Sequence, residues 1–181
     1  MAEPLKPIPV KLFTGIFFCE KDLILKLKEN LIEKIGEIDY ESEVFDFNFT
    51  DYYEKEMGKN IKRIFYSFKE LINPAKIVDI KYISFEIEKK FMDSEGKRKI
   101  NIDPGYMDFF KVVLASFKPG GYKIYLDKGV YADITLWYEK GKFKPLLTSF
   151  PDFKNNLYEK TFLKIRELYK KELKKLKLKN I

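Results

Sequence analysis

The sequence contains no histidine and only one cysteine, Cys19. The absence of histidine excludes Ser-His-Asp and Cys-His nucleophiles, histidine general bases and His-ligated zinc or iron sites. One cysteine cannot form an internal disulfide or a thiolate zinc site, and its apolar neighbours predict a small buried side chain. Acid–base chemistry would therefore fall to carboxylates, lysine or tyrosine, and a reducing, cytoplasmic compartment is expected.

Long hydrophobic segments are also missing. No apolar run approaches the roughly 18 residues of a membrane-spanning helix, and residues 1–9 have neither an apolar core nor a small-residue cleavage site. We therefore expect no signal peptide and no membrane partner. Glutamine is absent and lysine far outnumbers arginine. This composition is typical of a thermophile protein, and an AT-rich genome would produce the same bias.

Aromatic residues make up 17% of the chain and charged residues 35%. The charged fraction exceeds the usual value of about 25%. Its 181 residues suffice for one domain with a substantial core. No internal repeat or linker interrupts the chain. We therefore expect a single domain over residues 1–181.

Hydrophobic periodicity predicts the elements of the first half. A mostly apolar run at 10–18 indicates a buried strand, and apolar residues three and four apart from Leu23 to Ile35, ended by Gly36, predict a helix. Alternation predicts strands at 45–49 and 61–68, and a helix follows from Asn73 to Phe91. With the next strand, this order is the β-α-β-β-α-β of ferredoxin-like folds.

The second half predicts further strands and a final helix. Asp103-Pro104-Gly105 has the residues of a tight turn, so we expect strand, turn and strand there. A β-meander over 122–126, 131–137 and 142–147 would turn at 127–129 and 139–141. A basic amphipathic helix covers about 155–178. The predicted fold class is α+β with a mainly antiparallel sheet.

Most of the net charge lies in this last helix. Residues 159–179 carry nine Lys or Arg against three Glu, about +6 of the net +7. One interpretation is an electrostatic arm for nucleic acid over residues 155–179. The other is a terminal helix that docks its apolar seam on the sheet, where late lysines complement the helix dipole.

A polar and aromatic cluster follows the predicted strand at 45–49. Asp51, Glu54 and Glu56 offer three carboxylates beside the phenols of Tyr52 and Tyr53. Mg²⁺ sites use one or two carboxylates with substrate phosphates, so these residue types suit that metal. Solvated carboxylates paired with nearby lysines are the alternative.

Three further patterns could contribute to a site. The predicted turn would direct Asp103 and Tyr106 beyond the sheet end, although turn geometry alone also explains the motif. Alternation in 131–137 would place Tyr131, Asp133 and Thr135 on one face, as pocket lining or as an open sheet face. Lys118 precedes a Pro-Gly-Gly segment that could hold a phosphate or form an ordinary hairpin turn. No P-loop occurs.

Several short segments together resemble a known family. They are residues 50–58, 101–106, 113–115, 124–126 and 151–152, in this order. Their combination resembles a prokaryotic family of about this length, catalogued as a domain of unknown function and sometimes labelled GTP-binding. The chain has Tyr122-Lys123 where a His-Arg pair is usual, and Thr148-Ser149-Phe150 where Trp-Thr-Tyr is usual. The resemblance implies candidate positions and no activity.

The main functional hypothesis is a pocket for a phosphate- or nucleotide-containing small molecule. Its candidate acids, for proton transfer or a divalent metal, are Asp51, Glu54, Glu56, Asp103 and Asp133. Its candidate ligand-binding residues are Tyr52, Tyr53, Tyr106, Lys118, Tyr131 and Thr135. The alternatives are an RNA- or ribosome-associated module that uses the basic helix, and an interaction or oligomerisation module that uses the helix seam.

Overall fold

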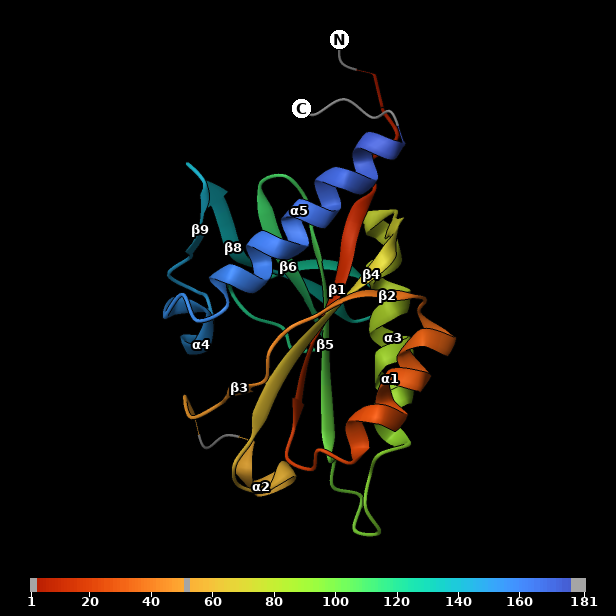
Figure 1. Cartoon of the computed structure of the whole chain (residues 1–181), viewed down its shortest axis with the longest axis vertical. Coiled ribbons are helices and arrows are strands. Elements are labelled where there is room, and N and C mark those ends of the chain that lie inside the picture. The colour runs from red at the N-terminus through yellow and green to blue at the C-terminus, as the bar shows by residue number, and fades with distance from the viewer. Residues whose placement is uncertain (1–2, 51–52, 177–181) are drawn as a thin grey trace.

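A computed structural model describes residues 3–50 and 53–176 of the chain. Its described part forms one antiparallel sheet of nine strands with helices on both faces (Figure 1). The strands are β1 (Val10–Phe18), β2 (Ile38–Glu41), β3 (Phe45–Asp46), β4 (Lys62–Ile72), β5 (Ile100–Met107), β6 (Lys111–Ser116), β7 (Ile124–Asp127), β8 (Val130–Glu139) and β9 (Lys142–Pro145). The helices are α1 (Leu23–Lys34), α2 (Glu54–Met57), α3 (Ile77–Lys89), α4 (Pro151–Lys154) and α5 (Glu159–Lys175), and a 3₁₀ turn at Pro74–Lys76 precedes α3.

The predicted α+β fold class is confirmed. The sheet order is β2-β4-β1-β5-β6-β8-β7, with β3 on β4 and β9 on β8. Four strands, in the order β2-β4-β1-β5 with α1 and α3 as the crossover helices, have the ferredoxin-like arrangement. The sequence predicted this element order with the segment 45–49 as the second strand, a place that β2 occupies in the structure. The predicted strand at 45–49 is shorter, since β3 ends at Asp46, and β2 had no clear alternation to predict it.

Two apolar clusters hold the layers together. On one face, α1 and α3 bury residues such as Leu27 and Ile77 against Ile16 and Ile102 of the sheet. On the other face, α5 crosses the strands (Figure 1) and packs Phe162 and others against them. Burial of this apolar area is the main favourable contribution to folding.

The C-terminal helix is confirmed, with a later start than expected. Asn156 adopts a left-handed conformation, with φ 55°, between α4 and α5, so the long helix begins at Glu159 rather than near residue 155. The seam of α5 is fully buried against the chain's own sheet: Phe162, Ile165 and Tyr169 have 0% exposure. The predicted helix end near residue 178 lies outside the described residues.

The expected turn at Asp103-Pro104-Gly105 is wrong. β5 runs through all three residues, and each pairs with β1, Pro104 opposite Thr14 and Gly105 opposite Phe13. The chain turns instead after Met107, where Asp108 Oδ1 accepts the backbone N–H groups of Phe110 and Lys111. The motif has turn composition for a different physical reason.

The proline and glycine of this motif are explained by the short pairing between β5 and β6. β6 pairs with only Gly105, Tyr106 and Met107. Pro104 lies one residue before this pairing begins, where β5 has no β6 partner. Proline has no backbone N–H that would be left unpaired there, so a sheet tolerates proline at such a position. A Cβ on Gly105 would lie 2.5 Å from the Val113 carbonyl oxygen and 2.6 Å from the Phe13 ring, so glycine is required for the close approach of the strands.

The three strands and two turns predicted for the β-meander are confirmed. β7 and β9 both pair with the edge of β8 that lies opposite β6, and β8 contains an irregularity. The two turns place Lys128 and Lys140, each followed by a glycine, in left-handed conformations. β8 pairs Val112 with Leu136 but Val113 with Ile134, so Thr135 is an extra residue in a bulge. The expected single face for Tyr131, Asp133 and Thr135 is therefore wrong, because the alternation changes at Thr135.

Candidate functional site

β5 pairs with β6 only from Gly105 to Met107, so the sheet divides between the earlier part of β5 and β6. On this open side of β5, the backbone N–H of Ile102 donates to Glu88 Oε1 at 2.6 Å, and its carbonyl accepts from Lys81 Nζ at 3.2 Å. Both side chains come from α3, which packs against β5. Charged side chains therefore occupy the hydrogen-bonding positions that a neighbouring strand would otherwise fill.

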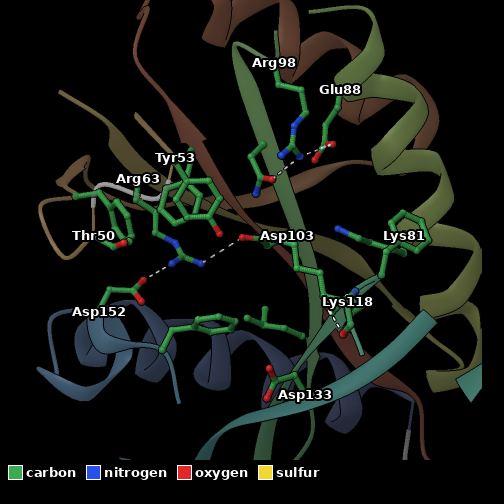
Figure 2. Close-up of a pocket in the computed structure, with 18 of the residues that line it drawn as sticks. Thr50, Tyr53, Arg63, Lys81, Glu88, Arg98, Asp103, Lys118, Asp133 and Asp152 are labelled. Atoms are coloured by element: carbon green, nitrogen blue, oxygen red, sulfur yellow. Dashed lines mark hydrogen bonds and ion pairs between the residues drawn. The ribbon is translucent and has the colours of Figure 1, made fainter. Parts of the chain in front are cut away.

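A cavity of about 240 Å³ occupies this division. Side chains of β1, β4, β5, β6, β8, α3 and α4 line it, together with residues of the segments 47–53, 117–123 and 150–152. Figure 2 shows Arg63 extending towards Asp152 and Asp103, with Lys81 and Lys118 to the right of Asp103. Sites of this kind, concave with a few converging polar groups, are where small ligands bind.

Arg63 forms one wall of the cavity. Its guanidinium pairs with Asp152, whose Oδ2 also accepts from the Tyr158 hydroxyl at 3.1 Å. Aromatic rings enclose the guanidinium, the nearest being Phe17 at 4.4 Å from its central carbon. Gly15 provides the space, since a Cβ there would lie 2.8 Å from Arg63 Nη2.

Asp103 is the second acid near Arg63. Its Oδ2 lies 3.9 Å from Arg63 Nη2, and 26% of its side chain is exposed, unlike the buried Asp152. Arg63 is thus held by a buried carboxylate on one side and approached by a cavity-facing carboxylate on the other. Asp103 is the one that a ligand can reach.

Arg98 organises the end of the cavity next to α2. It donates from Nε and Nη2 to the two oxygens of Glu56, at 2.6 and 2.7 Å. Its Nη1 donates to Asn101 Oδ1 at 2.9 Å and lies 3.4 Å from Glu88. The Arg98 guanidinium holds the pKa of Glu56 below its usual range. Burial raises the pKa of Glu88, although Lys81 opposes this shift.

The wall formed by β6 and β8 carries a second acid–base pair. Lys123 Nζ lies 3.6 Å from Asp133 and 3.1 Å from Ser116 Oγ. Burial raises the pKa of Asp133, and Lys123 partly opposes the shift. The ring of Phe150 lies 5.9 Å from the same ammonium, so this wall combines charge with an aromatic surface.

The cavity brings together some of the residues that the sequence predicted as a site. Asp103, Asp133, Tyr53 and Lys118 line it. The residues that do not line it are Glu54, Glu56, Tyr106, Tyr131 and Thr135. Asp51 and Tyr52 lie outside the described residues.

Four of these five absences have a local cause. Glu54 is exposed on α2, while Glu56 reaches the site indirectly through Arg98. Tyr106 is three positions from Asp103 in an uninterrupted strand, so it points to the face that α1 and α3 cover. Thr135 is in the bulge, where its hydroxyl donates to the Asp133 carbonyl.

Within residues 3–50 and 53–176, no three Asp, Glu or Cys side chains come close enough to hold a metal ion. The acids of the cavity are separated by cations: Arg63 lies between Asp103 and Asp152, and Lys123 lies beside Asp133. The described part of the site therefore favours an anionic or hydrogen-bonding ligand over a bare cation.

Seven residues of the cavity were not among the predicted site residues: Arg63, Lys81, Glu88, Arg98, Asn101, Lys123 and Asp152. The family resemblance included the positions of Asn101, Lys123 and Asp152 without giving them a role. For two of the seven a signal was present. Lys81 and Glu88 occupy the same helical stripe as Ile77 and Ser84, at spacings of three and four, on the buried side of α3. Charged residues on a buried helix face indicate a site, because they are rarely buried without a partner. Arg63, one of few arginines, is likewise in a buried strand.

The basic surface of α5 lies away from this cavity. Its exposed lysines are Lys160, Lys164, Lys170, Lys171, Lys174 and Lys175. Two of them pair with Glu167, through Lys164 at 3.0 Å and Lys171 at 2.7 Å. The sheet face that RNA-binding modules of ferredoxin-like order leave open for base stacking is covered here by α5.

Comparison with known families matches residues 8–169 to the family described as "Domain of unknown function (DUF4416)". This confirms the family resemblance found from the short segments and does not test the GTP-binding label. No curated protein and no solved structure matches the chain. No helix of the described residues is long and apolar enough to cross a membrane.

Proposed function

We propose that this chain, which belongs to the DUF4416 family of unknown function, binds a phosphate- or nucleotide-containing small molecule in the cavity between β5 and β6. The ligand's anionic group would lie against Lys81, and its planar part against the aromatic rings. A volume of about 240 Å³ is at or below the small end of ligand pockets, so the ligand is small.

Lys81 is the observation that carries this proposal. Its side chain is buried, at 8% exposure, and lines the cavity. The ammonium has three donors, of which the Ile102 carbonyl takes one. Among the described residues no carboxylate forms an ion pair with it, and Glu88 acts on it only at longer range. A buried cation without a paired anion is unfavourable, so a bound anion would stabilise it.

The rest of the lining supports the same ligand class. Lys118 lies across the cavity from Arg63 (Figure 2). Lys123 also lines the cavity, so both lysines add positive charge. Phe17, Phe85, Phe117 and other aromatic side chains provide surfaces on which a planar ring can stack. If the bound molecule also reacts, Asp103 and Asp133 are the acids in reach, and burial raises the pKa of Asp133 above its usual range.

Thermal unfolding with a panel of ligands tests the proposal. We expect a nucleoside phosphate, or inorganic phosphate alone, to raise the melting temperature, because a ligand that binds only the folded state stabilises it by mass action. Lys81→Met should abolish this shift. Lys76→Met, at an exposed position just before the same helix, is the matched control and should retain it.

Two results would contradict the proposal. The first is that no phosphate-containing compound of the panel shifts the wild-type melting temperature. The second is that Lys81→Met shifts with the ligand as the wild type does, which would place the ligand elsewhere. The melting temperature of each variant without ligand separates loss of binding from loss of folding.

The exposed lysines of α5 favour a second candidate function, binding of RNA along the helix. Deleting residues 155–181 is not a usable test, because Phe162 and Ile165 belong to the core. The double variant Lys170→Glu/Lys174→Glu keeps the helix, and both positions are exposed. If α5 binds RNA, affinity for a mixed-sequence RNA should fall steeply with salt in the wild type and be largely lost in this variant.

A further inference from the structure

The amide of Asn101 has a fixed orientation. Its oxygen accepts from Arg98 Nη1 at 2.9 Å. A guanidinium only donates hydrogen bonds, so the amide must present its oxygen, and not its nitrogen, to Arg98. Arg98 is itself held by the two-pronged ion pair with Glu56. The NH₂ group of Asn101 is therefore directed away from Arg98.

This NH₂ group has no hydrogen-bond partner among the described residues, although Asn101 is 6% exposed and lines the cavity. A buried donor without an acceptor is unfavourable, and such groups are rare in folded proteins. Asn101 thus lines the cavity and holds a positioned, buried donor that has no acceptor among the described residues.

The neighbours of Asn101 complete a recognition surface. Asn101 pairs with Phe17 of β1, which pairs with Arg63 of β4, so the three side chains form a row across the sheet. Asp103, two residues further on, is on the same face and offers a partly exposed carboxylate. A donor and an acceptor therefore lie side by side on β5, next to the aromatic ring of Phe17.

We infer that Asn101 is a specificity-determining residue that donates to a ring acceptor of the ligand, while Asp103 accepts from a neighbouring N–H. The ligand's planar part then carries an acceptor and a donor on one edge, as heterocyclic bases do. This inference rests on the proposed function, because the anionic group at Lys81 places the ring in the cavity. The inference adds that hydrogen bonds, and not stacking alone, determine which planar ring of the ligand binds.

The test compares probes with and without a ring. The four common nucleoside 5′-monophosphates are titrated against ribose 5-phosphate, which has the same anion and sugar without the base. We expect at least one monophosphate to bind roughly tenfold or more tightly than ribose 5-phosphate, since each hydrogen bond contributes about 1 kcal/mol and 1.4 kcal/mol is tenfold.

Two variants assign this preference to Asn101. Asn101→Leu removes the donor, and Asn101→Asp replaces it with an acceptor that repels the ring acceptor. In both, the ratio between the monophosphate and ribose 5-phosphate should fall to about one, with ribose 5-phosphate binding unchanged. A purely structural role of Asn101 would weaken both probes alike. Asn30→Leu, at an exposed amide of α1, is the control and should keep the ratio.

The outcomes are separable. If no probe binds the wild type, the proposed function itself is refuted, and this inference with it. If ribose 5-phosphate and every monophosphate bind equally, the anion site stands and the reading of a ring edge is refuted. If the ratio is high in the wild type and persists in both Asn101 variants, another residue reads the ring.

Discussion

The ion pair between Arg63 and Asp152 allows a quantitative test of how this site is built. Both side chains are 2% exposed, and they come from β4 and α4, far apart in the sequence. Replacing Arg63 with methionine keeps an unbranched side chain among the aromatic rings. It leaves the Asp152 carboxylate buried with the Tyr158 hydroxyl as its one remaining side-chain donor among the described residues. Replacing Asp152 with asparagine leaves the guanidinium without its buried carboxylate.

The expected cost follows from burial. Removing one partner of a buried ion pair costs about 3–5 kcal/mol, because the remaining charge is uncompensated. For a chain of this size, 1 kcal/mol lowers the melting temperature by about 2–4 °C, so each single variant should melt roughly 6–20 °C below the wild type. In Arg63→Met/Asp152→Asn no isolated buried charge remains. Its loss of stability should therefore be well below the sum of the two single losses.

Urea denaturation of the wild type, the two single variants and the double variant measures all four free energies of unfolding. We expect a coupling free energy of about 2–4 kcal/mol, with unchanged dependence on urea concentration. Additive losses in the double variant would refute the reasoning, since they would show that each side chain acts through its own packing. Single losses below about 1 kcal/mol, the range of surface ion pairs, would also refute it.

Two further predictions concern the division of the sheet. Gly105→Ala should cost about 1–3 kcal/mol in urea denaturation, because its Cβ would meet backbone at 2.5 Å. Gly120→Ala, whose Cβ would meet only the Lys123 stem at 3.6 Å, should change stability by less than about 0.5 kcal/mol, and equal losses would contradict the close-approach argument. Burial raises the pKa of Glu88 in the folded state, so the folded chain binds more protons than the unfolded chain above pH 4.5, and this residue makes stability fall as pH rises. Glu88→Gln should flatten that decline, and an identical pH profile of unfolding free energy in the variant would contradict it.

The fold was largely predictable because its signals are local. The apolar run at 10–18 and the spacing of leucines and isoleucines in α1 show their periods within single segments. Most elements of the ferredoxin-like order follow from these periods; β2, which has no clear alternation, does not. The meander turns were equally local, since Lys-Gly at 128–129 and 140–141 suits left-handed backbone.

Asp103-Pro104-Gly105 failed for a non-local reason. Turn propensity and a divided sheet select the same residues: proline where an N–H would be unpaired, and glycine where strands approach closely. Single-sequence reasoning cannot distinguish the two, because the deciding contact is with Val113 of another strand. The bulge at Thr135, which moved Asp133 away from its expected neighbours, depends on pairing in the same way.

The candidate site was only partly predictable for a related reason. Asp103, Asp133, Tyr53 and Lys118 share the cavity, yet the groups that hold it in shape, Arg63 and Asp152 among others, come from elements that meet only after folding. A buried cation such as Lys81 is recognised by what surrounds it. In the sequence its only signal is its position on the buried stripe of α3, which indicates a buried charge but not what surrounds it.

Because β5 and β6 pair only at Gly105, Tyr106 and Met107, the sheet consists of two panels joined by this short pairing. One panel holds the ferredoxin-like strands and the other holds β6 to β9. α5 lies across both, in contact with β1 and β4 on one side and β9 on the other, and contributes no residue to the cavity. α5 therefore connects the two panels, and we expect its packing to influence the angle between them and with it the width of the opening. Substitutions under α5 would alter what the cavity admits without touching its walls.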